Sequence, residues 1–175
     1  MPVNGYSVFD GDGHVLESDE ELSQYFEGDF EGGQCMTGLS IFPSLDGWSR
    51  GPMLKAEDTN RKYWHTDAQV WSECLEMIGA EGTVLYPTAA LAHGLMRDVD
   101  FASAAATAYN NWLEDRYTSK DTRLFGAGCT PIQDPIAGAK EIIRCANDRQ
   151  GIVAMTLPTV TNTGKTYGDK FFWPI

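Results

Sequence analysis

The feature that most constrains the fold is an alternation of strand-like and helix-like segments along the chain. Short apolar runs bounded by Gly or Pro predict strands, and longer runs with apolar residues at three-to-four spacing predict helices. The predicted strands cover about 6–15, 83–86, 124–129 and 152–157, and the predicted helices about 67–78, 100–117 and 134–150. Strands separated by helices of this length form βαβ units, so the sequence predicts an α/β protein with a parallel sheet.

The predicted helices carry specific end signals and apolar faces. Asp67 is placed to cap the first helix and Gly79 to end it, while Asp134 followed by Pro135 marks the start of the third. In the second helix an apolar stripe consists of Phe101, Ala104, Ala105, Ala108, Tyr109, Trp112 and Leu113. We expect the buried face of the third helix to consist of Ile136, Ala139, Ile143 and Ala146.

The loops are unequal in length, and this predicts where a site lies. Helix-to-strand connections are short, whereas the connection after the first strand spans about fifty residues and the one after the second about a dozen. In parallel α/β folds the loops after the carboxyl ends of the strands build the ligand site. The pattern therefore favours an enzyme or a binding protein, with simple tolerance of insertions as the alternative.

The charge distribution excludes one class of partner. The net charge is −12, and residues 1–49 hold ten acidic residues but no Lys or Arg. Residues 50–175 hold the other fifteen acidic residues and all thirteen basic ones. An acidic first third repels a phosphate backbone and no basic patch compensates for it, so nucleic acid is not expected as a partner.

Membrane and secreted proteins are not expected either. No apolar run approaches the roughly 18 residues of a membrane span, and the opening MPVNGYSVFDGDGH lacks the basic and apolar regions of a secretory signal. The four cysteines, Cys35, Cys74, Cys129 and Cys145, contain no C-x-x-C pair and are expected to be reduced thiols. These features predict a cytoplasmic protein.

The best candidate for chemistry is the segment DGDGH at residues 10–14, where the first strand ends. Residues two apart on a strand share a face, so Asp12 and His14 project together, with Asp10 one step behind. A carboxylate beside an imidazole is half of a site for a divalent metal such as zinc or manganese. The alternative is a turn-rich strand end with solvated acids. A calcium loop is rejected, because His14 and Val15 stand where its fifth position and its required glycine belong.

Five stretches carry a resemblance to a known family: DGDGHVLE, VLYPTAAL, AYNNWLEDRY, RLFGAGCTPIQDPIAGAKEI and GIVAMTLP. In this order they resemble the amidohydrolase-related family, the branch of the amidohydrolase superfamily that includes aminocarboxymuconate-semialdehyde and γ-resorcylate decarboxylases. The resemblance covers residues 6–17 and 65–175. Residues 18–64 are a variable insert, which we expect to form a hairpin or a small lid on the site face.

The resemblance implies an incomplete TIM-type (β/α)8 barrel. Residues 1–175 then supply about the first four parallel strands with their flanking helices and the long insert after strand 1, as the N-terminal part of one barrel domain. The resemblance also implies one divalent metal ion, with zinc favoured over manganese, and Asp12 and His14 match the ligand pair on the first strand. The family's further ligands, a His and an Asp, come from later strands, so catalytic residues are expected downstream of residue 175.

Three more residues are candidates for substrate binding. Glu17 matches the acid of the family's H-x-x-E-P stretch, although Ser18 replaces the proline. Thr88 ends the second strand beside the predicted metal, and His93 lies on the following loop, within reach of a substrate carboxylate. The alternatives are a strand-ending turn for Thr88 and a solvated side chain for His93, and His65 is expected to be structural.

Two functions remain in competition at this point. The first is a metal-dependent hydrolase or non-oxidative decarboxylase that acts on a small aromatic or cyclic carboxylic acid, and the sequence does not choose between these reactions. The second is a truncated, non-catalytic remnant that serves as an assembly or binding module, because two ligands hold a metal weakly. A sheet of four strands has an unpaired edge, so we also expect a homodimer.

Overall fold

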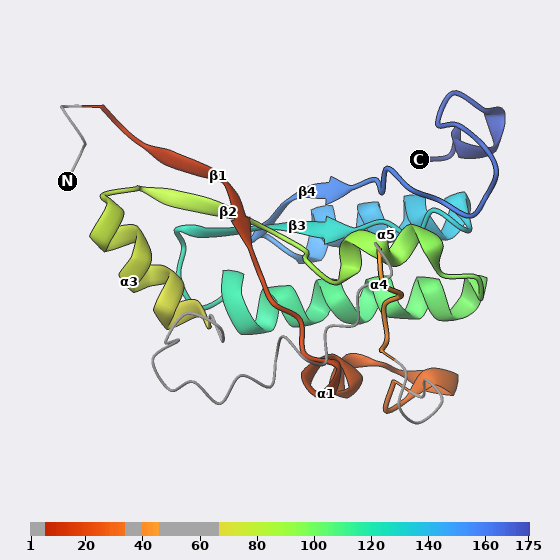
Figure 1. The fold of residues 1–175 in the computed structure, drawn as a ribbon, viewed down its shortest axis with the longest axis horizontal. Helices are drawn as coiled ribbons and strands as arrows, with labels where there is room; N and C mark the ends of the chain where they lie inside the picture. The colour runs from red at the N-terminus through yellow and green to blue at the C-terminus, as the bar shows by residue number, and fades with distance from the viewer. Residues whose placement is uncertain (1–5, 34–39, 46–66) are drawn as a thin grey trace.

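The computed structural model describes residues 6–33, 40–45 and 67–175 (Figure 1). Its centre is a four-stranded sheet in the order β1-β2-β3-β4, and every neighbouring pair is parallel. The strands are β1 (Phe9–His14), β2 (Gly82–Tyr86), β3 (Leu124–Cys129) and β4 (Ile152–Thr156). The predicted parallel α/β sheet is therefore confirmed.

Three long helices precede β2, β3 and β4 in turn: α3 (Ala68–Ile78), α4 (Val99–Leu113) and α5 (Pro135–Asp148). Figure 1 shows α4 running along the strands. The connections contain short helical segments, namely α1 (Asp19–Leu22), η1 (Ser23–Tyr25), η2 (Gly28–Phe30), η3 (Ala90–Leu95) and η5 (Lys170–Phe172). A single π-type turn, η4 (Glu114–Thr118), continues α4, so the predicted helix 100–117 is present with a change of winding near its end.

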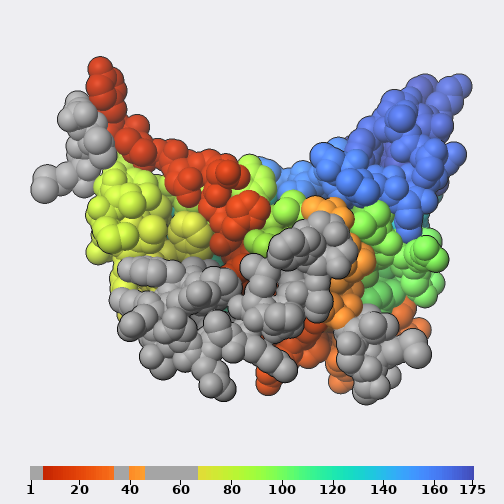
Figure 2. Space-filling view, in the orientation of Figure 1, coloured from red at the N-terminus to blue at the C-terminus, as the bar shows by residue number. Residues whose placement is uncertain are grey.

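The core lies between the sheet and α4. Leu85 and Leu124 are fully buried, whereas the next residue along each strand, Tyr86 or Phe125, is only half-buried. The buried residues of α4 are Ala102, Ala105, Ala106, Ala108, Tyr109, Asn110, Trp112 and Leu113. The sheet thus packs one face on helices, and the space-filling view is hollowed along its upper edge, between β1 and the C-terminal segment (Figure 2).

The helix-end signals of the sequence are confirmed. Asp67 accepts a hydrogen bond from the Val70 N–H at the start of α3, and Gly79 ends that helix with a φ of 72°. This left-handed conformation favours glycine because it has no Cβ. Asp134 caps α5 by accepting from the first N–H groups, with Pro135 at the first helical position.

The predicted buried face of α5 is wrong. Ile136 and Ile143 are each 60% exposed, whereas Gly138, Glu141 and Cys145 are buried. The Glu141 carboxylate is drawn inward by hydrogen-bonding side chains of α4 and α5. An argument from hydrophobic periodicity assigns every glutamate to the surface, so it could not predict that hydrogen-bond partners bury Glu141.

The described part of the insert packs on α4. Leu22 and Phe26 are buried, and the Phe26 ring stacks on Phe101 with ring centroids 5.5 Å apart. Ile41 and Phe42 join the same hydrophobic core. The insert is therefore attached to the domain by apolar contacts, and its role as a lid stays a prediction.

Two smaller expectations concern membranes and cysteines. No helix in the described ranges is long and apolar enough to cross a membrane. Cys74, Cys129 and Cys145 are free thiols, as predicted. Cys35 and His65 lie outside the described residues.

Candidate functional site

The end of β1 contains a β-bulge that decides which side chains face the same way. Asp10 pairs with Thr83 of β2, but the next pair on the same face joins Gly13 to Leu85, so β1 has one extra residue in between. Asp10 closes the bulge, since its carboxylate accepts from Thr83 Oγ1 at 2.7 Å and from the Asp12 N–H at 3.2 Å. The expectation that Asp10 shares a face with Asp12 is therefore wrong, because the extra residue reverses the alternation.

Asp12 and His14 lie together, as the sequence predicted. Asp12 Oδ1 and His14 Nε2 are 3.8 Å apart, with the side chain of Asp12 92% exposed and that of His14 39% exposed. Both belong to the carboxyl end of β1, where parallel α/β folds place their sites. The pair is open to solvent and to an incoming ion.

The hydrogen bonds of His14 determine which ring nitrogen faces this pair. His14 Nδ1 lies 2.9 Å from the Pro87 carbonyl oxygen and 3.2 Å from Thr88 Oγ1. A carbonyl oxygen only accepts hydrogen bonds, so a hydrogen bond between His14 and Pro87 requires the proton on Nδ1. In the neutral ring, Nε2 then presents a lone pair beside the Asp12 carboxylate.

This arrangement fits part of the coordination shell of a divalent metal. Two donor atoms that each lie about 2.1 Å from one ion are at most about 4.2 Å apart, and the Asp12–His14 separation of 3.8 Å is within that limit. A metal-binding histidine commonly donates its other N–H to a backbone carbonyl, as His14 does to Pro87. Among the described residues no group of three or more His, Cys, Asp or Glu side chains is placed to hold a metal ion, so the pair is an incomplete site.

Glu17 connects the loop after β1 to the loop after β2. Its two carboxylate oxygens accept hydrogen bonds from the backbone N–H groups of Thr88, Ala89 and Ala90, at 2.8–3.3 Å. Burial raises the pKa of the Glu17 carboxyl above its usual value, and the N–H donors oppose this in part. N–H donors face both oxygens, which is the geometry of an ionised carboxylate. Glu17 therefore holds backbone, and its predicted contact with substrate stays a prediction.

Thr88 and His93 have different surroundings. Thr88 is half-buried and lies beside His14, with Oγ1 3.2 Å from His14 Nδ1, and its contact with substrate stays a prediction. His93 is 1% exposed, with Nδ1 2.8 Å from the Ala90 carbonyl oxygen and Nε2 2.5 Å from that of Thr130. Burial lowers the pKa of His93. These contacts favour a structural role, and the geometry offers no support for a substrate contact by His93.

Sequence reasoning missed the contribution of the Pro87 carbonyl. At this strand end the sequence pointed only to Thr88, and a carbonyl oxygen is common to all residue types. The signal that pointed to this place was indirect: a strand end, a proline and a hydroxyl residue in succession.

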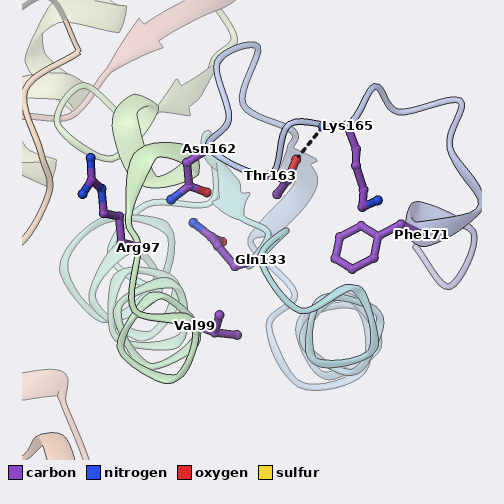
Figure 3. A pocket seen from close by; sticks show the side chains of 7 residues that line it. All are labelled: Arg97, Val99, Gln133, Asn162, Thr163, Lys165 and Phe171. Carbon is purple, nitrogen blue, oxygen red and sulfur yellow. Dashed lines mark hydrogen bonds between the residues drawn. The ribbon is translucent and has the colours of Figure 1, made fainter.

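Apart from the Asp12–His14 pair, a hollow lies at the loops that follow β2, β3 and β4. Its volume is about 530 Å³, and it is lined by Arg97, Val99, Gln133, Asn162, Thr163, Lys165 and Phe171. Arg97 and Lys165 stand at opposite sides of the hollow (Figure 3). The polar groups of a ligand site converge on the ligand. The two charged residues of this hollow, both cationic, lie on opposite sides of it, so the hollow is the weaker candidate.

No protein-family model matches the chain, and no curated protein matches it. Solved structures do match. One is an amidohydrolase from Mycobacterium avium subsp. paratuberculosis, with a TM-score of 0.66 and 14% identity, over 97% of this chain and 55% of that chain.

Two decarboxylases match over similar lengths. A 5-carboxyvanillate decarboxylase from Novosphingobium aromaticivorans, with bound manganese and 3-methoxy-4-hydroxy-5-nitrobenzoic acid, has a TM-score of 0.58 and 19% identity, over 97% of this chain and 47% of that chain. A dihydroxybenzoic acid decarboxylase from Polaromonas sp. JS666, with manganese and the inhibitor 2-nitroresorcinol, has a TM-score of 0.60 and 20% identity, over 96% and 44%.

These matches show the fold. The four parallel strands and their helices correspond to part of a TIM-type barrel, and the chain spans about half the length of the matched structures. The resemblance derived from the sequence motifs is thus confirmed at the level of the fold, with an amidohydrolase and aromatic-acid decarboxylases as structural neighbours.

Proposed function

We propose that this chain provides the first-strand half of a divalent metal site in a metal-dependent hydrolase or carboxy-lyase. The observation that carries the proposal is the Asp12–His14 pair, with its donor atoms 3.8 Å apart at the carboxyl end of β1. The fold supports it, because matched structures with this fold contain manganese. Manganese and zinc are therefore the two ions to test.

The residues have separate tasks in this proposal. His14 Nε2 and an Asp12 carboxylate oxygen would hold the ion, while the Pro87 carbonyl orients the imidazole. When bound, such an ion either polarises and orients a substrate carboxylate or lowers the pKa of a water molecule. Thr88 Oγ1 lies 3.2 Å from His14 Nδ1, and in this proposal its hydroxyl would orient a substrate oxygen.

For the substrate we propose a small aromatic carboxylic acid. The supporting observation is that two of the matched structures are decarboxylases of hydroxylated benzoic acids. In that reaction the bond between the ring and the carboxyl carbon breaks, CO2 leaves, and a proton takes its place on the ring. Hydrolysis is the alternative, as the match to an amidohydrolase leaves open.

The first experiment measures metal binding. The affinity of the purified protein for Mn²⁺ and Zn²⁺ is determined by titration calorimetry for the wild type and the variants Asp12→Asn and His14→Ala. We expect each variant to bind at least tenfold more weakly. Asp10→Asn is the matched control, since Asp10 faces the opposite side of the sheet and bonds to Thr83. Unchanged affinity in His14→Ala would falsify the proposal.

The second experiment measures the reaction. Wild-type protein loaded with manganese is incubated with 2,6-dihydroxybenzoate, and CO2 release is followed against His14→Ala. Product that depends on His14 supports decarboxylation. Metal binding without turnover of either a hydroxybenzoate or an amide substrate favours the competing function, a non-catalytic assembly module.

That competing function has its own support in the structure. Ile136, Ile143 and Val153 of α5 and β4 are more than half exposed, although each is a large apolar side chain. Apolar surface of this kind is typical of association, so the predicted homodimer is retained as a proposal. A cytoplasmic location is retained in the same way, since free thiols are typical of reducing compartments.

A further inference from the structure

One peptide unit lies between Glu17 and His14. The Thr88 N–H donates to Glu17 Oε1 at 3.0 Å, and the Pro87 carbonyl of the same peptide unit lies 2.9 Å from His14 Nδ1. A trans peptide unit is planar, and its N–H and C=O point in opposite directions. Glu17 therefore accepts from the N–H at one edge of the peptide unit, while His14 contacts the C=O at the opposite edge.

The hold of Glu17 on this peptide does not depend on a single bond. The next two N–H groups, of Ala89 and Ala90, also donate to its carboxylate, at 2.8 and 2.9 Å. Successive N–H groups that converge in this way form a nest for one anion. Rotation of the Pro87–Thr88 peptide would take the Thr88 N–H out of this set, and the loss of such an enclosed hydrogen bond costs about 1–3 kcal/mol.

We propose that Glu17 is a positioning residue that sets the tautomer of His14 by fixing the Pro87 carbonyl. With that carbonyl in place, a proton on Nδ1 has an acceptor. The opposite tautomer, protonated on Nε2 toward Asp12, would turn the Nδ1 lone pair against a carbonyl oxygen at 2.9 Å. Glu17 thus keeps Nε2 free of its proton and available as a ligand.

The tautomer of His14 is a property of the metal-free protein, while its consequence for metal affinity rests on the proposed function. This separates the two hypotheses. If His14 binds no metal but its tautomer depends on Glu17, the proposed function fails and the positioning role stands. If metal binds through His14 but the His14 tautomer does not change when Glu17 is replaced, the proposed function stands and the positioning role fails.

The experiment records the imidazole ¹⁵N shifts of metal-free protein at about pH 8, where an ordinary histidine is neutral. His14→Ala assigns the signals. We expect wild-type His14 to be protonated on Nδ1, and Glu17→Gln to populate both tautomers, because its amide NH2 group faces N–H donors. The affinity of the Glu17→Gln variant for Mn²⁺ should fall about tenfold or more, as is usual when a residue that orients a metal ligand is replaced.

Glu21→Gln is the matched control. It makes the same chemical change four residues further on, where the carboxylate accepts from Trp112 Nε1 and Arg116 instead of the loop after β2. We expect its His14 tautomer and its Mn²⁺ affinity to equal those of the wild type. Equal changes in both variants would mean that loss of negative charge, not positioning, is responsible.

Other outcomes also decide the matter. A wild-type His14 protonated on Nε2 overturns the proposal without any variant. A Glu17→Gln protein that melts at a lower temperature but keeps the wild-type tautomer shows that Glu17 only stabilises the fold. If Glu17→Gln does not fold, Glu17→Asp replaces it, since its shorter carboxylate cannot reach all three N–H groups and should give the same mixture of tautomers.

Discussion

Two enclosed carboxylates, Glu17 and Glu141, are held in opposite ways. Among the described residues, the Glu17 carboxylate accepts from backbone N–H groups of the loop after β2. Glu141 of α5 accepts from side chains: two bonds from the Arg144 guanidinium at 2.6 and 2.8 Å, one from Asn110 at 2.7 Å and one from Thr107 at 3.2 Å. In the part of the chain that the structure describes, the first carboxylate thus has backbone amides as partners, whereas the second has the Arg144 cation.

The difference decides the direction of each pKa. For Glu17, burial raises the pKa and the backbone donors only reduce the effect. For Glu141, burial also raises the pKa, but the hydrogen bonds and charge of Arg144 with those of Asn110 and Thr107 outweigh it, so its pKa lies below the usual value. The backbone amides around Glu17 order the loop after β2, but they do not fully compensate for burying its charge. The Arg144 guanidinium, by contrast, stabilises the negative charge of Glu141.

The largest effect is expected from breaking the Glu141 cluster. Glu141→Ala removes the carboxylate that accepts from both the Arg144 guanidinium and the Asn110 amide, and removal of one member of a buried ion pair costs about 3–5 kcal/mol. Unfolding by urea, followed by circular dichroism, measures this loss. Lys140→Ala, at an exposed position on the same helix, should change the unfolding free energy by less than about 0.5 kcal/mol.

The packing of β1 against β2 and α3 is tested by substituting two glycines of β1. A Cβ on Gly13 would collide with Thr83 Oγ1 and press on Leu85 and Trp71, while one on Gly11 meets nothing within 4 Å. Gly13→Ala should therefore destabilise the protein by about 1–3 kcal/mol, the usual cost of overpacking, and Gly11→Ala should be nearly neutral. Equal melting temperatures for the two variants would show that β1 does not lie against β2 and α3 as described.

The contrast in pKa predicts opposite pH trends. A carboxyl group whose pKa is lowered on folding stabilises the protein above its unfolded pKa, about 4.3 for Glu, and this contribution is lost as pH falls through the folded value. The stability difference between wild type and Glu141→Gln should therefore shrink below about pH 4. For Glu17, with a raised pKa, the difference from Glu17→Gln should become less favourable to the wild type as pH rises above about 4. Urea titrations at several pH values measure both, and parallel trends would contradict the comparison.

The smallest effect on stability is expected on the outer face of α5. Ile143→Glu replaces an apolar side chain that is 60% exposed, so the unfolding free energy should change by no more than about 0.5 kcal/mol. If the exposed face mediates self-association, sedimentation equilibrium will show a larger monomer fraction for this variant. Asn147→Glu, at an exposed position one turn further along, is the control. No change in association would remove the support of this face for a homodimer.

Most of the architecture was predictable because it depends on local patterns. β3 was predicted at 124–129 and observed there, and the Asp67 and Asp134 caps were correct, since a cap acts on N–H groups two or three residues away. The face of α5 was not predictable, because two partners of Glu141, Asn110 and Thr107, lie on α4, 31 and 34 residues distant in sequence.

By itself, the sequence determined the order of strands and helices, the parallel sheet and the placement of Asp12 and His14 on one strand end. Only the tertiary structure decided that Asp10 faces away, that the Pro87 carbonyl meets His14, and that Glu17 holds that peptide. The reason is physical. Periodicity and capping arise from side chains within a few residues of each other, whereas a bulge and contacts between backbone and side chain more than seventy residues apart exist only after the strands have paired.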